Sequence, residues 1–220
     1  MNLLEIFGQL SAGMLASIQI FVLTLIFSLP LGLLVAFGRM SKNVIIRTII
    51  QVYISIMRGT PLMLQLMVLY FGPYFLLGIR VTNEYRFYAV IIGFALNYAA
   101  YFAEIYRAGV QSIDHGQHEA AKTLGFSRWQ TMRIIIIPQT IARVIPPVSN
   151  EVITLIKDTA LVTAIGVGEL LKAAKDANNR DVNPTAFFIA AVIYLALTFL
   201  LTLLSQWCEK RFSRHERQEA

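Results

Sequence analysis

The sequence has few charged residues and only one cysteine. Charged residues make up 15% of its 220 positions, against roughly 25% in a soluble globular domain. This scarcity excludes an intrinsically disordered chain, which would be polar and rich in net charge. Because Cys208 stands alone, an internal disulfide and a cysteine-based metal cluster are also excluded.

Apolar residues take the positions that charges leave free. They make up 56% of the chain, and the mean hydropathy is +0.61. A single water-soluble core in a chain of this length could not bury so much apolar surface. We therefore expect a polytopic helical membrane protein whose residues 1–220 form one transmembrane domain.

Long uncharged intervals mark the candidate membrane spans. Crossing the hydrocarbon core takes about 20 helical residues. Four intervals without charged residues are candidate spans, and a fifth, more polar candidate covers 141–168. It is interrupted by Glu151, Lys157 and Asp158, and charges at membrane depth usually face protein or a wet cavity. We predict an all-α fold with five transmembrane helices. The four intervals without Asp, Glu, Lys or Arg are 6–38, 59–79, 87–103 and 182–208.

The first interval should remain in the protein as a helix. It is about twice as long as the apolar part of a cleaved signal peptide, and no basic residue precedes it.

The basic residues predict the orientation of the chain. Of the 19 basic residues, five fall on one side of the predicted membrane and twelve on the other. In membrane proteins, the loops on the cytoplasmic side carry the excess of Lys and Arg. We expect the N-terminus outside and the C-terminus in the cytoplasm. The net charge of +6 is then a topology signal, and no nucleic acid is expected as a partner. The twelve are Arg39, Lys42, Arg47, Arg107, Lys122, Arg128, Arg133, Arg143, Lys210, Arg211, Arg214 and Arg217.

The connection between the third and fourth spans, about 110–138, is long and organised. Gln117–Leu124 is predicted as a short helix that ends at Gly125, a residue suited to a left-handed C-cap. Ser127 and Gln130 fit a capping box that begins a second short helix. A long ordered connection is usually functional. We expect a rigid cytoplasmic knob that contacts a soluble partner.

This loop resembles a known motif. Glu119-Ala120-Ala121, Gly125, Ile135, Ile137 and Pro138 resemble the EAA loop, E-A-A-x₃-G-x₉-I-x-L-P. That loop is typical of the membrane permease subunits of bacterial ATP-binding-cassette importers. Ile137 replaces its usual Leu.

Three further segments resemble the polar amino-acid uptake branch of that family, so the likeness covers nearly the whole chain. Where Ser often stands in this branch, the chain has Ala160. The segments are Arg58-Gly59-Thr60-Pro61, Glu104-Ile105-Tyr106-Arg107-Ala108-Gly109, and Lys157-Asp158-Thr159 followed by Leu161.

The resemblance implies an ATP-driven amino-acid importer in the bacterial plasma (inner) membrane. This chain would form the translocation path, together with a second permease that is an identical or a related copy. Two cytoplasmic ATPase subunits would hold ATP and Mg, with no cofactor in this chain, and an extracytoplasmic substrate-binding protein would deliver the amino acid. The residues implied to couple to the ATPase are Glu119, Ala120, Ala121, Gly125 and Pro138.

Motifs for catalysis or metal binding are absent from the sequence. No glycine is followed by lysine, so there is no phosphate loop, and no nucleophile–base arrangement is visible. We expect no enzymatic activity in this chain. His115 and His118 with Glu119 form no complete set of metal ligands, and we expect them to be solvated.

Two of the expected spans carry polar stripes. In the first span, Tyr101 and Glu104 follow Asn97 by four and seven positions. In the second, Thr154 and Asp158 follow Glu151 by three and seven positions. Each set therefore shares one helical face. Such stripes would line a wet path for a zwitterion. The hypothesis places four residues on that path near the middle of the bilayer: Thr60, Asn97, Glu104 and Asp158.

Each of these residues also has a structural alternative. Glu104 could pair with Arg107 three residues later. Lys157 could neutralise a carboxylate on its own span, and Asn97 could join two helices. Pro61 predicts a break or kink after Arg58, whereas Arg58 itself could simply extend to the headgroups.

Two functional alternatives remain open at this point. An ion-gradient secondary transporter or channel would work without ATP, and a membrane scaffold would use its charges only for structure. The sequence does not specify the amino acid.

Overall fold

The structure is all-helical, as expected. A computed structural model describes residues 3–212, a range that contains no β-strand. Arg214 and Arg217, counted above among the basic residues, lie outside it. The elements in order are α1 (Leu3–Arg39), α2 (Val44–Gly59), α3 (Leu62–Leu77), α4 (Asn83–Gln111), α5 (His115–Thr123), α6 (Arg128–Gln130), the π-helix η1 (Thr131–Ile136), α7 (Ile137–Asp158), the 3₁₀-helix η2 (Thr159–Ile165), α8 (Leu170–Asp181) and α9 (Thr185–Phe212).

Three helices are long and apolar enough to cross a membrane: α1 from Ile6, α4 and α9. The pair α2 and α3, bent by 106°, is a fourth candidate. The expected polar span corresponds mainly to α7, which carries Glu151 and Lys157 and does not meet the same criterion of length and composition. Five spans and the orientation of the termini therefore stay predictions.

Small residues allow α1 and α4 to pack closely. Ala95, Ala99 and Ala103 of α4, which step by four along one face, are all buried. A Cβ added at Gly32 of α1 would lie 2.8 Å from the Cβ of Phe102, so the two backbones touch at this point. The small side chains of this alanine face thus permit close helix packing.

The chain breaks between α2 and α3, as Pro61 predicts. Thr60 has extended backbone angles (φ −123°, ψ 147°) because the proline that follows disfavours the helical conformation. The side chain of Gln65 crosses the break and donates to the carbonyls of Met57 and Thr60 at 2.9 and 3.1 Å. Asn97 of α4 also donates to the Met57 carbonyl, at 2.9 Å. Side chains thus satisfy the backbone groups that the break frees.

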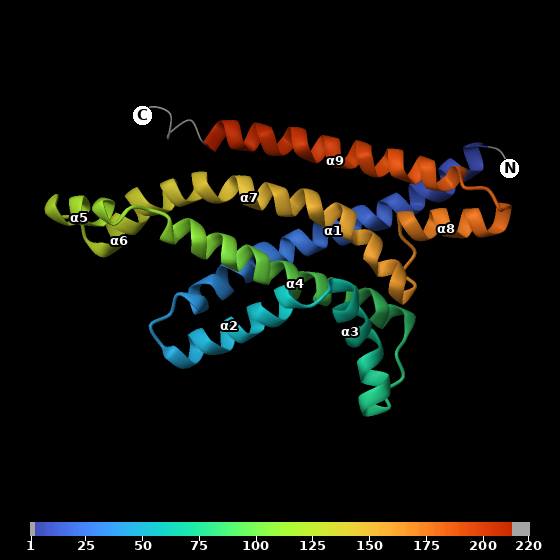
Figure 1. Cartoon of the computed structure of the whole chain (residues 1–220), viewed down its shortest axis with the longest axis horizontal. Helices are drawn as coiled ribbons and strands as arrows, with labels where there is room; N and C mark the ends of the chain where they lie inside the picture. The colour runs from blue at the N-terminus through green and yellow to red at the C-terminus, as the bar shows by residue number, and fades with distance from the viewer. Residues whose placement is uncertain (1–2, 213–220) are drawn as a thin grey trace.

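The predicted knob lies at one end of the molecule, where α5 and α6 extend beyond the other helices (Figure 1). Gly125 has φ +78°, and the Phe126 amide bonds the Ala121 carbonyl, which confirms the left-handed C-cap. The capping box of Ser127 and Gln130 is present as well. The second helix does not stay short, however, because it continues through η1 into α7 without a break.

The opposite end contains the start of α1 and the helix α8 (Figure 1). Glu169 begins α8 as its N-cap and is fully buried. Its carboxylate accepts from the amides of Leu171 and Lys172, both at 2.7 Å, and from the Tyr194 hydroxyl at 3.0 Å. This anchoring role of Glu169 was not predicted from the sequence.

Candidate functional site

Two polar cavities open along α4. The first, of about 560 Å³, is called here the Asp158 cavity, and the second, of about 490 Å³, the Arg143 cavity. Both are lined by Arg58 of α2, Tyr101 of α4 and Glu151 of α7. They therefore adjoin each other, with these three side chains at the junction.

The Asp158 cavity brings together three of the four predicted path residues: Thr60, Asn97 and Asp158. They come from the α2–α3 break, from α4 and from the end of α7. Residues more than 90 positions apart in the sequence thus meet around one polar space, which supports the hypothesis that the stripes of α4 and α7 face a common path.

Asp158 is held in this cavity by a tyrosine that the sequence analysis did not select. The hydroxyl of Tyr98, a buried residue of α4, donates to Oδ2 of Asp158 at 2.8 Å. Lys157, the suggested partner of a carboxylate on α7, is exposed, and its side chain forms no ion pair within residues 3–212.

Asn97 combines the two roles considered for it. Its side chain lines the cavity, yet its amide is engaged with the Met57 carbonyl and with Oε1 of Gln65 at 3.0 Å. Thr60 donates to the Ile56 carbonyl at 2.8 Å and accepts from Gln65 at 2.8 Å. Both residues therefore stabilise the helix break beside the cavity.

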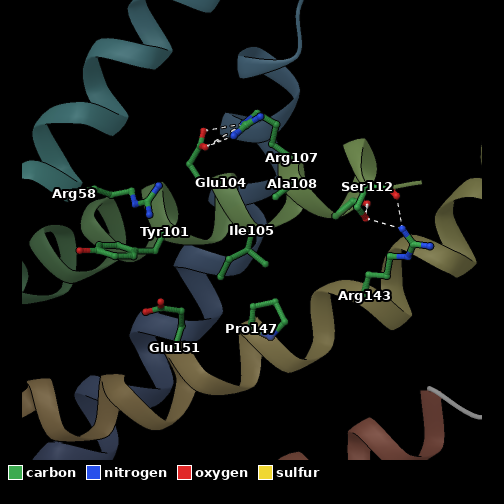
Figure 2. Close-up of a pocket in the computed structure, with 11 residues that line it drawn as sticks. Arg58, Tyr101, Glu104, Ile105, Arg107, Ala108, Ser112, Arg143, Pro147 and Glu151 are labelled. Atoms are coloured by element: carbon green, nitrogen blue, oxygen red, sulfur yellow. Dashed lines mark hydrogen bonds and ion pairs between the residues drawn. The ribbon is translucent and has the colours of Figure 1, made fainter. Parts of the chain in front are cut away.

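Glu104 lies in the Arg143 cavity (Figure 2). The other three predicted residues line the Asp158 cavity instead. Arg107 donates to its carboxylate through Nε and Nη2, the closest contact being 2.6 Å, and Arg39 approaches to 3.7 Å. The pairing with Arg107 that was the structural alternative is confirmed. In this structure, Glu104 is a member of an ion-pair network that lines the Arg143 cavity.

Arg58 and Glu151 are cavity residues that the predicted set omitted. The Arg58 guanidinium lies 5.1 Å from the centre of the Tyr101 ring, a distance typical of a cation–π contact. Across the described part of the chain, neither Arg58 nor Glu151 has a hydrogen bond or ion pair from its side chain. The polar stripe of Glu151, Thr154 and Asp158 was the sequence signal that could have included Glu151.

The two other arginines that line the Arg143 cavity are engaged. Arg107 bonds Glu104 and Gln111, and Arg143 bonds the carbonyl and the hydroxyl of Ser112 (Figure 2). Arg143 thereby ties the start of α7 to the end of α4.

The predicted coupling residues differ in their accessibility. Glu119 and Ala120 are exposed, and so are Gly125 and Pro138, whereas Ala121 is buried within its own chain. The N-cap of α5 is Asp114, whose carboxylate accepts from the Gly116 amide at 2.6 Å. Glu119 therefore does not cap its own helix, and its carboxylate is available to a partner.

The two histidines of the knob lie near each other, with ring centres 6.2 Å apart. Residues 3–212 contain no group of three or more His, Cys, Asp or Glu side chains arranged to hold a metal ion.

Comparison with known proteins gives consistent similarities. A family profile described as "Binding-protein-dependent transport system inner membrane component" matches residues 28–214. The probable amino-acid ABC transporter permease protein YckA of Bacillus subtilis is 41% identical over 187 residues, 84% of this chain and 80% of that protein. The L-cystine transport system permease protein TcyB of Bacillus subtilis is 39% identical over 208 residues, 94% of this chain and 87% of that protein.

Solved structures show the same arrangement of helices. A crystal structure of an amino acid ABC transporter with histidines superposes with a TM-score of 0.87 at 32% identity, covering 94% of this chain and 96% of that one. An inward-facing structure of the MetNI methionine ABC transporter has a TM-score of 0.74 at 18% identity, covering 97% of this chain and 100% of that one. The second similarity supports the fold alone.

Proposed function

The chain belongs to the family of binding-protein-dependent transport system inner membrane components, and from that premise we propose that its two polar cavities form the path of an amino acid through the membrane. It is a permease component of an amino-acid ABC importer and a multi-pass protein of the bacterial inner membrane. The observation that carries the proposal is the convergence of Thr60, Asn97 and Asp158 on one polar cavity.

The chemistry of the cavity suits a zwitterion. A volume of about 560 Å³ falls within the range of small-molecule sites. The cavity offers carboxylates from Glu151 and Asp158 and a guanidinium from Arg58. Ionisable groups at membrane depth are costly, and those that occur usually face a transport path. A discontinuous helix beside the site, here at Thr60 and Pro61, is a common transporter feature.

The orientation and the partners complete the proposal. The end with α5 and α6 faces the cytoplasm, because the excess of basic residues lies on that side. The knob from about 110 to 138 docks into a cytoplasmic ATPase subunit, and two ATPases and a second permease complete the membrane complex. A binding protein delivers the amino acid from the other side, an assignment supported by the family description.

Within the knob, we assign the coupling contacts to the exposed residues Glu119, Ala120 and Pro138. Gly125 and Ala121 act differently, since they shape the turn after α5: Gly125 supplies the positive φ, and the Ala121 carbonyl accepts the bond that closes the turn. A rigid knob transmits motion of the ATPases to α7, because α6, η1 and α7 form one continuous helical run.

The proposal is tested by reconstitution. The chain is purified with its second permease and ATPases and inserted into vesicles, and uptake of glutamine, arginine, histidine and cystine is measured with and without ATP. We expect uptake of at least one amino acid only with ATP. Uptake driven by an ion gradient without ATP would instead support the secondary-transporter alternative.

A further inference from the structure

Arg58 stands out among the basic residues of the two cavities. It is the only Lys or Arg among the residues that line the Asp158 cavity, and it lines the Arg143 cavity as well. Its side chain is exposed and contacts the Tyr101 ring, with no acceptor in the described part of the chain. Arg107 and Arg143, by contrast, are bonded to acceptors of their own.

The position of Arg58 follows from the helix break. Arg58 is the second-last residue of α2, directly before Gly59 and Thr60, where the chain turns by 106°. In Figure 2 its guanidinium lies over the Tyr101 ring, with Glu151 of α7 on the other side of that ring. The charge is thus presented to the polar space from the side opposite α7.

A guanidinium without an acceptor at such a place is suited to a carboxylate. Its planar N–H groups match the two oxygens of a carboxylate and bind them through two parallel hydrogen bonds. A lysine would offer only a point charge. The carboxylates Glu151 and Asp158 of the same cavity repel an anion and attract an ammonium group.

We infer that Arg58 binds the α-carboxylate of the transported amino acid, leaving Glu151 and Asp158 for its α-ammonium group. This inference rests on the proposed path through the Asp158 cavity and adds the group that recognises an amino acid as opposed to an amine. Because Arg58 also lines the Arg143 cavity, the same contact guides the substrate from one cavity to the next.

The inference is tested by comparing amino acids with their decarboxylated counterparts. The probes are arginine and agmatine, histidine and histamine, cystine and cystamine, and glutamine and 4-aminobutanamide. Binding of each is measured to the permease–ATPase complex in lipid nanodiscs without the binding protein, so that the selectivity of that protein does not contribute. The variants are Arg58→Gln and Arg58→Lys. Arg47→Gln, on the same helix but outside both cavities, is the matched control.

We expect the wild type and Arg47→Gln to bind at least one amino acid about tenfold or more tightly than its amine, as the loss of a charge-assisted contact predicts. Arg58→Gln should abolish this preference while amine binding stays unchanged, and Arg58→Lys should restore part of it. An unchanged preference in Arg58→Gln would overturn the inference while leaving the proposed path intact.

Two other results separate the remaining possibilities. If the wild-type complex binds none of the four amino acids, the Asp158 cavity is not a substrate site, and the proposed path fails with the inference. If Arg58→Gln loses its second permease or its ATPases while Arg47→Gln keeps them, Arg58 pairs with a group across an interface, and the inference is overturned.

Discussion

The guanidinium of Arg86 donates a hydrogen bond of 3.1 Å from Nη1 to the carbonyl of Gly166, 80 residues away in the sequence. The same guanidinium donates to the hydroxyl of Tyr70 from Nε and Nη2 at 3.3 and 3.1 Å. One arginine of α4 thus fastens α3 to the turn after η2. Since η2 follows Asp158 directly, this contact fixes the position of the chain that follows the Asp158 cavity.

Replacement of Arg86 by Gln should loosen this attachment. Hydrogen bonds from a charged donor contribute about 1.5–3 kcal/mol each, so we expect a clear fall in the apparent melting temperature of the purified permease. Arg80→Gln, an exposed arginine of the neighbouring turn, is the matched control and should melt like the wild type. Equal melting of both variants would show that the Arg86 contacts do not stabilise the fold.

The helix break should depend on Asn97. Asn97→Leu removes the donor to the Met57 carbonyl and to Oε1 of Gln65. The Met57 carbonyl keeps its bond from Gln65, but Oε1 of Gln65 loses its partner, and an unpaired acceptor in a buried place costs about 1–3 kcal/mol. We expect lower thermal stability in detergent. Asn179→Leu, on the exposed face of α8, provides the comparison. If the two leucine variants melt at the same temperature, Asn97 does not hold the break.

Glu169 should matter for stability although it lies far from the knob. Glu169→Ala removes the acceptor of two amides and of the Tyr194 hydroxyl from a fully buried place, and loss of a helix N-cap alone costs about 1 kcal/mol. Glu169→Gln keeps one acceptor oxygen and should lose less. The exposed pair of Lys172 and Asp176 offers the control Asp176→Ala, for which a change below about 1 kcal/mol is expected. Thermal unfolding is measured for the three variants, and Glu169→Ala should lose the most stability, Glu169→Gln less and Asp176→Ala the least.

Local rules predicted several of these elements from the sequence. Pro61 predicted the helix break, Gly125 the C-cap, and the spacing of Ser127 and Gln130 the capping box, because each depends on backbone geometry within a few residues. The polar stripes of α4 and α7 followed from helical periodicity in the same way.

The rest depends on contacts between distant segments, which such rules do not describe. Glu104 and Asp158 are both acidic residues of expected spans. Only the packed structure shows that Arg39 and Arg107 form ion pairs with Glu104. It also shows that Tyr98 donates a hydrogen bond to Asp158, which lines a cavity. The contact of Arg58 with the Tyr101 ring and the burial of Glu169 likewise depend on which helices surround them.

The turn at Gly125 should be required for assembly with the ATPase. Gly125 has φ +78°, a conformation that costs a residue with a side chain roughly 1–2 kcal/mol, and a β-branched residue is especially disfavoured there. We expect Gly125→Val to reduce the amount of ATPase that co-purifies. Gly168→Val is the control, since Gly168 has open space around it and no positive φ. Intact co-purification with Gly125→Val would contradict the proposed role of the knob.

The two carboxylates of the predicted path should respond differently to neutralisation. Asp158 faces the cavity and, among residues 3–212, its carboxylate accepts one side-chain hydrogen bond, from Tyr98. Asp158→Asn should therefore reduce ATP-driven uptake about tenfold or more, the effect of losing one charge-assisted contact with substrate. Glu104 is engaged by Arg107 and Arg39, so Glu104→Gln should change the apparent affinity little and lower the melting temperature instead. Uptake and thermal stability are measured for both variants in the same reconstituted complex. If Asp158→Asn shows normal uptake with unchanged affinity, Asp158 does not belong to the path. If Glu104→Gln loses affinity while its thermal stability is unchanged, substrate contacts the Arg143 cavity as well.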